Sequence, residues 1–116
     1  MRIIGINGVW CWQNPVWDTL RPAFLERFSG ATFIIEGDFD LWPHELTRMR
    51  RFIAGLCEKY DDGTPALLVG HSMGGIFALA VAAQLRRTKV LGITTIFSPH
   101  RFPFVLFAPL LGAGYH

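Results

Sequence analysis

Cysteine is scarce in this sequence, with Cys11 and Cys57 as the two examples among 116 residues. Small disulfide-stabilised domains and structural zinc sites use more cysteines at short, regular spacing, and nothing here suggests either class. We therefore expect no metal and no cofactor. A chain without a disulfide framework fits a reducing compartment, so a cytoplasmic location is the expectation.

Net charge and long apolar runs are also limited. The formal net charge is +2, too small to indicate a nucleic-acid partner. The longest apolar runs, at 74–83 and 102–113, are shorter than the roughly 18 residues that a membrane span needs. The first residues contain no signal-peptide core and no cleavage site. These observations predict no nucleic-acid partner and no transmembrane segment.

Acidic residues are absent from the last part of the chain. All nine Asp and Glu residues lie before Ser72, whereas residues 73–116 contain four Lys or Arg residues and no acid. A carboxylate that follows Ser72 is therefore missing from these residues, which limits the catalytic sites that they can complete.

Hydrophobic residues make up 51% of the sequence, enough to bury a core, and the length fits one domain over 1–116. Runs of apolar and β-branched residues predict strands at 3–6, 31–36, 67–69 and 90–97. Helical spacing predicts helices at 46–60, at 75–85 and, because of Pro22, from near Thr19 to Phe28. Alternating strands and helices predict an α/β protein with three α/β/α layers and a parallel sheet of about four strands.

The stretch at 65–75, PALLVGHSMGG, joins the third strand to the most apolar helix. It contains the pattern Gly-x-Ser-x-Gly around Ser72. A serine on a turn between a strand and a helix stands with its hydroxyl exposed above the sheet, and glycines give such a tight turn its room. The pattern and its place in the chain predict a nucleophile elbow.

The residues Gly70-His71-Ser72-Met73-Gly74-Gly75 resemble the elbow of the α/β-hydrolase superfamily, in particular that of small lipases and serine esterases. This resemblance implies the amino-terminal part of an α/β-hydrolase fold with strand order 2-1-3-4. It further implies that Ser72 attacks a carboxylic ester or thioester, and that the backbone N–H groups of Val9 and Met73 form the oxyanion hole. Asn7 stands where the family usually has histidine.

The triad of this family runs serine, acid, histidine along the chain, and no acid follows Ser72. Three interpretations stay open. The chain is the amino-terminal piece of a longer hydrolase; or it is a non-catalytic module that binds a partner; or an unusual site uses Asp38 or Asp40 with His44 or His100 as its base. Of the histidines, we name His100 as the candidate base in the chain as given.

The substrate that the resemblance implies is a small ester or a lipid-like molecule. The apolar stretch 102–111 is either the start of a lid that touches lipid or core that lacks its partner strands. An exposed edge on the fourth strand, together with this stretch, predicts that the isolated 116 residues aggregate or dimerise.

Overall fold

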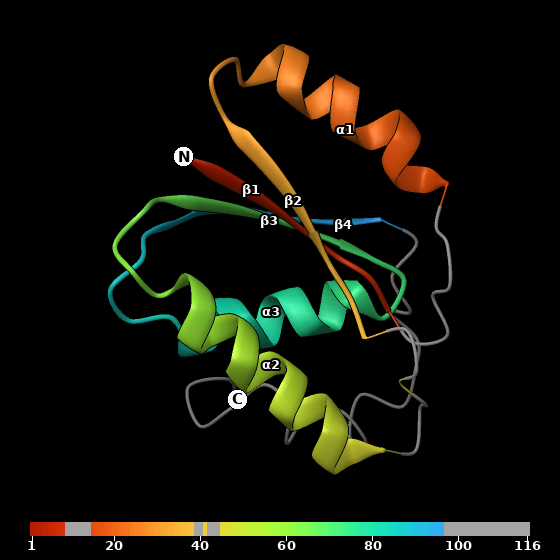
Figure 1. Cartoon of the computed structure of the whole chain (residues 1–116), viewed down its shortest axis with the longest axis vertical. Coiled ribbons are helices and arrows are strands. Elements are labelled where there is room, and N and C mark those ends of the chain that lie inside the picture. Colours follow the sequence, from red (N-terminus) through yellow and green to blue (C-terminus); the bar gives the residue numbers. More distant parts are fainter. Residues whose placement is uncertain (9–14, 39–40, 42–44, 97–116) are drawn as a thin grey trace.

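The computed structural model describes residues 1–8, 15–38, 41 and 45–96, and Figure 1 shows their arrangement. The elements follow in the order β1 (Arg2–Ile6), α1 (Val16–Arg27), β2 (Thr32–Glu36), α2 (Leu46–Tyr60), β3 (Ala66–His71), α3 (Gly74–Gln84) and β4 (Val90–Ile96). The strands are parallel and lie in the order β2-β1-β3-β4. The predicted α/β fold and strand order are therefore confirmed.

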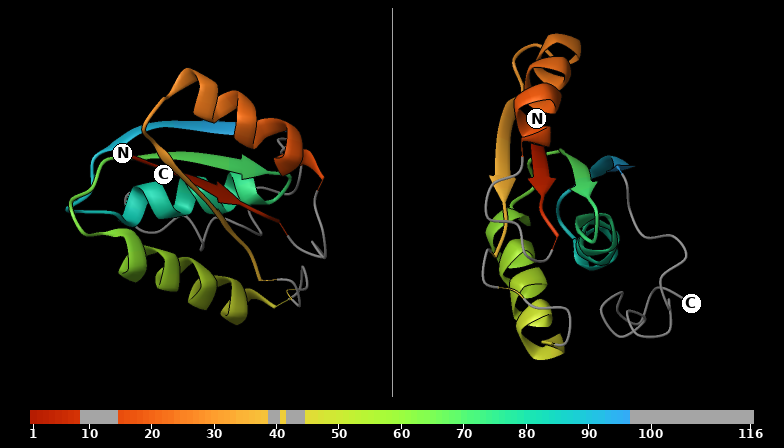
Figure 2. Two further views of the ribbon diagram at one scale, coloured as in Figure 1. Left: turned by 45° about the horizontal axis from the view of Figure 1, so that its top comes forward. Right: turned by 90° about the vertical axis from the view of Figure 1, so that its right-hand side faces the viewer.

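The sheet is covered on both faces (Figures 1 and 2). On one face α2 and α3 pack against alternate residues of the two central strands, including Ile4 and Leu68. On the other face α1 packs against the residues between them, including Ile3 and Leu67. Because both faces are buried, the central strands β1 and β3 are apolar at nearly every position, as in other parallel sheets.

Helix α2 follows its predicted pattern. Its buried residues are Met49, Ile53, Leu56 and Tyr60, and its charged residues lie on the exposed side. Helix α3 is buried along most of its length, again as predicted from its lack of charge.

Helix α1 begins earlier than predicted. It starts at Val16 rather than near Thr19, and Pro22 lies inside it. Proline lacks the N–H that would bond to the carbonyl of Asp18, which normally ends or kinks a helix. Here Trp17 is 4% exposed and anchors the first turn to the sheet. Tertiary packing of this tryptophan therefore outweighs the local effect of the proline.

The two edge strands, β2 and β4, carry exposed apolar residues. Strand β2 begins at Thr32, and Ile35 within it is exposed. In β4 the exposed apolar residues are Leu91 and Ile93. Leu91 is skipped in the pairing with β3, where Ala66 pairs with Val90 but the next residue pairs with Gly92. An edge position and a bulge both reduce the area that neighbours cover. The exposed edge of the fourth strand was predicted, whereas the bulge was not.

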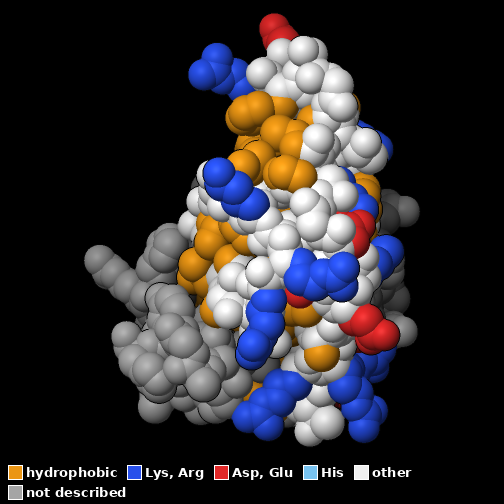
Figure 3. Space-filling model, turned by 90° about the vertical axis from the view of Figure 1, so that its left-hand side faces the viewer, with side chains coloured by type: hydrophobic (Ala, Val, Ile, Leu, Met, Phe, Trp, Pro, Cys, Tyr) orange, Lys and Arg blue, Asp and Glu red, His pale blue; other side chains and the backbone are white. Residues whose placement is uncertain are grey.

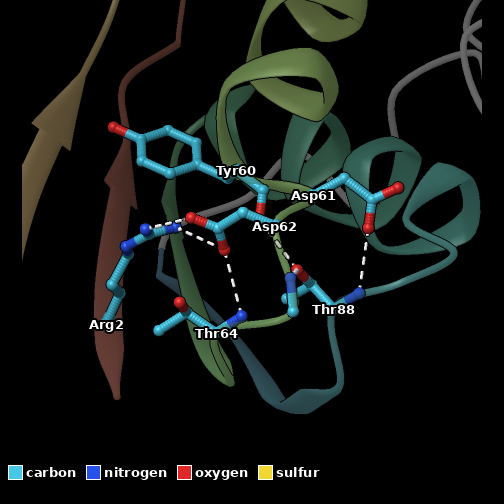
Figure 4. A network of polar contacts seen from close by, with 7 residues as sticks. Arg2, Tyr60, Asp61, Asp62, Thr64 and Thr88 are labelled. Carbon is cyan, nitrogen blue, oxygen red and sulfur yellow. Dashed lines mark hydrogen bonds and ion pairs between the residues drawn. The ribbon is translucent and has the colours of Figure 1, made fainter.

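Polar contacts join the segments at the end of the sheet where the strands begin (Figure 4). The Asp61 carboxylate accepts hydrogen bonds from the backbone N–H groups of Arg86, Arg87 and Thr88 at 2.7–3.2 Å. Desolvation alone would raise the pKa of Asp61, but these three bonds hold that pKa below its usual value. The Thr88 hydroxyl donates to the carbonyl of Tyr60 at 2.8 Å. The end of α2 is thereby fixed to the turn before β4.

The same end of the sheet holds an ion pair. The Arg2 guanidinium binds both oxygens of the Asp62 carboxylate, which also accepts the backbone N–H of Thr64 at 3.0 Å. The hydrogen bonds from Arg2 lower the pKa of Asp62 to about 2. Figure 3 views the molecule from this side and shows Lys and Arg side chains mainly in its lower half, with hydrophobic side chains above them. This end of the sheet is a mixed surface of charged and hydrophobic side chains.

Candidate active site at the turn after β3

Ser72 occupies the turn between β3 and α3. It is half-buried, with a backbone φ of +57°. Among the described residues it is the one non-glycine residue with positive φ. Side chains other than glycine rarely adopt this left-handed conformation because Cβ crowds the backbone. Strain of this kind is common where a fold must present one side chain in a fixed direction.

The glycines on either side of Ser72 allow the turn to pack closely. A Cβ atom on Gly70 would lie 2.3 Å from the carbonyl oxygen of Gly74. A Cβ atom on Gly74 would lie 2.0 Å from the carbonyl oxygen of Ile6, at the end of β1. No side chain fits in either place. The predicted succession of strand, sharp turn and helix is present, and both glycines are required by its contacts.

The end of β1 lies directly against this turn. Gly8 follows β1, and a Cβ atom there would lie 2.9 Å from the backbone nitrogen of Met73. Strands β1 and β3 are neighbours in the sheet, although β2 and α2 separate them in the sequence. The strand order therefore changes direction between β1 and β3, because β2 lies on one side of β1 and β3 on the other. Open α/β sheets bind ligands at such a point, beyond the carboxyl ends of their strands.

The start of α3 suits a developing negative charge. Its first turn contains no acidic residue, and no side chain caps its amino terminus. Within the described residues, the N–H of Met73 donates no hydrogen bond. An uncapped helix amino terminus presents free N–H groups and a partial positive charge. The predicted oxyanion donor Met73 lies at this amino terminus of α3.

Comparison with known families agrees with the observed fold. The family model of the alpha/beta hydrolase fold matches residues 17–111 of the sequence. The chain belongs to the α/β-hydrolase fold family. Comparisons with curated proteins and with solved structures find no match.

In this α/β-hydrolase-fold protein, Asn7 forms a hydrogen bond that the sequence did not reveal. Its side chain is 3% exposed, and its Oδ1 atom accepts a hydrogen bond from the indole N–H of Trp17 at 2.7 Å. The sequence marks Asn7 as a replacement for the usual histidine but offers no partner for it. A buried amide needs hydrogen bonds, and Trp17 could have been suspected as a donor, although helical spacing alone assigns it to the core.

The candidate acids and bases of the α/β-hydrolase are described only in part. The Asp38 carboxylate forms a two-point ion pair with Arg48, at 2.7 Å and 2.8 Å. This pairing matches a structural role for Asp38 in the loop after β2. The other candidate acids and bases lie outside the described residues, namely Asp40, His44 and His100. The predicted oxyanion donor Val9 also lies outside them.

His71 adjoins the candidate nucleophile as the last residue of β3, where it pairs with Ile96. Burial lowers its pKa, so its imidazole is neutral at neutral pH. The N–H of Ser72 donates to the carbonyl of Ile96 at 2.9 Å. The end of β4 therefore holds the backbone of the turn in place.

A metal-binding cluster and a membrane-spanning helix are both absent from the described residues. There, His, Cys, Asp and Glu do not gather in groups of three that could hold a metal ion. Every helix in the same part of the α/β-hydrolase is too short or too polar to cross a bilayer.

Proposed function

We propose that this α/β-hydrolase is a serine hydrolase that cleaves carboxylic esters or thioesters, with Ser72 as its nucleophile. The observation that supports this best is the left-handed turn at Ser72, packed against the end of β1. The turn combines a constrained serine backbone with the N–H of Met73, which donates no hydrogen bond to the described residues. A neutral binding site has no need of a strained serine beside an anion-stabilising helix end.

The proposed reaction begins when the Ser72 hydroxyl oxygen attacks the carbonyl carbon and a general base takes its proton. The N–H groups of Met73 and Val9 stabilise the oxyanion of the tetrahedral intermediate. The intermediate then expels the alcohol or thiol, which takes up the proton held by the base. An acyl group stays on Ser72 as an ester. Water hydrolyses this ester and restores the enzyme. His100 is the candidate base, and its orienting acid is unassigned.

The test is covalent labelling of the full-length protein with a fluorophosphonate, which reacts with activated serines. We expect labelling that is lost in Ser72→Ala and retained in Ser29→Ala, since Ser29 is an exposed serine at the end of α1. Hydrolysis of p-nitrophenyl esters of increasing acyl length then tests the preference for lipid-like substrates. A folded protein that takes up no label at Ser72 would refute the proposal.

A second candidate is a non-catalytic α/β-hydrolase module that binds a partner. The absence of any acid after Ser72 in these 116 residues favours it. The exposed Leu91 and Ile93 on the edge strand β4 could then contact that partner. Absence of labelling, together with partner binding that is lost in Leu91→Asp, would support this alternative.

The setting that we propose for the enzyme is the cytoplasm. Cys57 is a free thiol, which is the usual state in a reducing compartment. Localisation of the tagged full-length protein tests this directly, and a secreted product would contradict it.

A further inference from the structure

Two polar side chains are buried in the described part of the chain, Asn7 at 3% exposure and Thr88 at 6%. They lie at opposite ends of the sheet. Thr88 joins the elements at the edge where the strands start, and its role there is structural. Asn7 follows β1 at the other edge, two residues before the predicted oxyanion donor Val9. A buried polar group at this place calls for an explanation.

The partner of Asn7 is held firmly. The Trp17 ring lies on Gly5, where a Cβ atom would approach ring carbons to 2.8 Å. The ring also meets Phe33 edge to face, with centroids 6.0 Å apart. Gly5 and Phe33 thus restrict the ring, and its N–H points at Asn7. The 2.7 Å hydrogen bond to Asn7 therefore has a fixed donor.

Asn7 is held from a second side by the strand next to β1. Its backbone N–H donates to the carbonyl of Glu36, the last residue of β2, at 2.9 Å. Gly37 leaves room for the side chain, since a Cβ atom there would lie 3.0 Å from the Asn7 amide nitrogen. Helix α1 and strand β2 thus both determine the position of Asn7.

The next residue transmits this position to the site. Gly8 lies so close to the Ser72 turn that a Cβ atom on it would be 2.9 Å from the Met73 nitrogen. A Cβ atom on Gly74 would be 3.0 Å from the Asn7 carbonyl carbon. Only one peptide unit separates the fixed Asn7 side chain from these contacts. A shift of Asn7 would therefore move Gly8 relative to the Ser72 turn.

We propose that Asn7 and Trp17 are positioning residues for catalysis, because their hydrogen bond sets the distance between the turn after β1 and the Met73 N–H. The proposal rests on the proposed function. Neither residue is expected to touch the substrate. Oxyanion donors act at about 2.7–3.1 Å, and a displacement of about 1 Å can reduce a rate roughly 100-fold.

The test compares Asn7→Ala, Trp17→Phe and the double variant in the full-length protein. Each single change removes one partner of the hydrogen bond, and Trp17→Phe keeps an aromatic ring in the core. We expect kcat for a p-nitrophenyl ester to fall about 10- to 100-fold with KM changing less than about threefold. The double variant should lose no more than the worse single variant, since both changes remove the same bond.

Thr88→Val is the matched control. It removes the hydroxyl of the other buried polar residue at the opposite edge of the sheet while conserving side-chain volume. We expect it to lower the urea midpoint in the same manner as Asn7→Ala but to leave kcat within about twofold. If Asn7 had a structural role only, Asn7→Ala and Thr88→Val would affect kcat equally.

Several outcomes would overturn the proposal. They are an unchanged kcat in Trp17→Phe, multiplicative losses in the double variant, or an equal loss of kcat in Thr88→Val. If Asn7→Ala does not fold, Trp17→Phe decides. Fluorophosphonate labelling distinguishes failure of the positioning proposal from failure of the proposed function. A labelled parent protein with unaffected variants refutes positioning alone, whereas an unlabelled folded parent refutes the function and positioning together.

Discussion

Replacing Ser72 by glycine should stabilise the protein, although it removes the proposed nucleophile. The residue has φ +57°, a conformation that costs a residue with Cβ about 1–2 kcal/mol. Glycine avoids this cost but loses roughly 0.5–1 kcal/mol through its greater freedom in the unfolded chain. We expect Ser72→Gly to exceed Ser72→Ala in unfolding free energy by about 1 kcal/mol. Both variants lack the hydroxyl, so the difference between them isolates backbone strain.

Urea unfolding of the full-length protein, followed by circular dichroism, measures this difference. With a typical slope of about 2 kcal/mol per molar urea, the Ser72→Gly midpoint should lie roughly 0.5 M above that of Ser72→Ala. Ala54→Gly provides the control, because Ala54 is exposed within α2. The same change from alanine to glycine should there destabilise by about 1 kcal/mol.

The sign of the effect decides the outcome. A Ser72→Gly variant that is less stable than Ser72→Ala, as expected for an ordinary helix or loop position, would show that the turn is not strained. Ser72 would then lose the main geometric feature that distinguishes it from other serines of the chain.

Three other predictions concern further parts of the molecule. Gly8→Ala should slow fluorophosphonate labelling about tenfold or more, because its Cβ would lie 2.9 Å from a backbone nitrogen; Gly55→Ala, with nothing within 4 Å of the added atom, should leave the labelling rate unchanged. Asp62→Asn should reduce the loss of stability in acid: Arg2 lowers the pKa of Asp62 to about 2, below about 3.9 in the unfolded chain, so the pair stabilises the fold above about pH 4 and this contribution disappears as the pH falls toward 2. Urea midpoints at about pH 6 and pH 3 measure it, and equal acid losses in parent and variant would contradict it. Burial raises the pKa of Cys57 to about 11, so iodoacetamide near neutral pH should alkylate it more slowly in the folded than in the unfolded protein, as peptide mass spectrometry can show; equal rates would rule this out.

Much of the fold could be predicted because its rules are local. The spacing of Met49, Ile53 and Leu56 defines the buried side of α2 through the helical repeat alone. The apolar runs of β1 and β3 follow from burial on both faces of a parallel sheet. The early start of α1 and the exposure of Ile35 could not be predicted, because both depend on neighbours that are distant in sequence.

The candidate site divides in the same way. Ser72, Gly70 and Gly74 form a short pattern whose geometry follows from the turn that they make. The hydrogen bond between Asn7 and Trp17 leaves no such pattern, since its geometry is set by the packing of α1 across the sheet. Val9 and His100 lie outside the described residues, and their roles stay predictions.

The central position of β1 also has a consequence for the order of folding. This strand is synthesised before the other described strands, yet its partner β3 begins at Ala66. The ion pair beside it joins Arg2 to a residue 60 positions later. At about 5–20 residues per second, several seconds of translation separate β1 from that partner. Pairing between such distant parallel strands is slow and leaves strand edges open. The close approach of Gly8 to Met73 therefore waits until β3 has been synthesised, and slower translation of residues 37–65 would lengthen the time that β1 waits with one side unpaired.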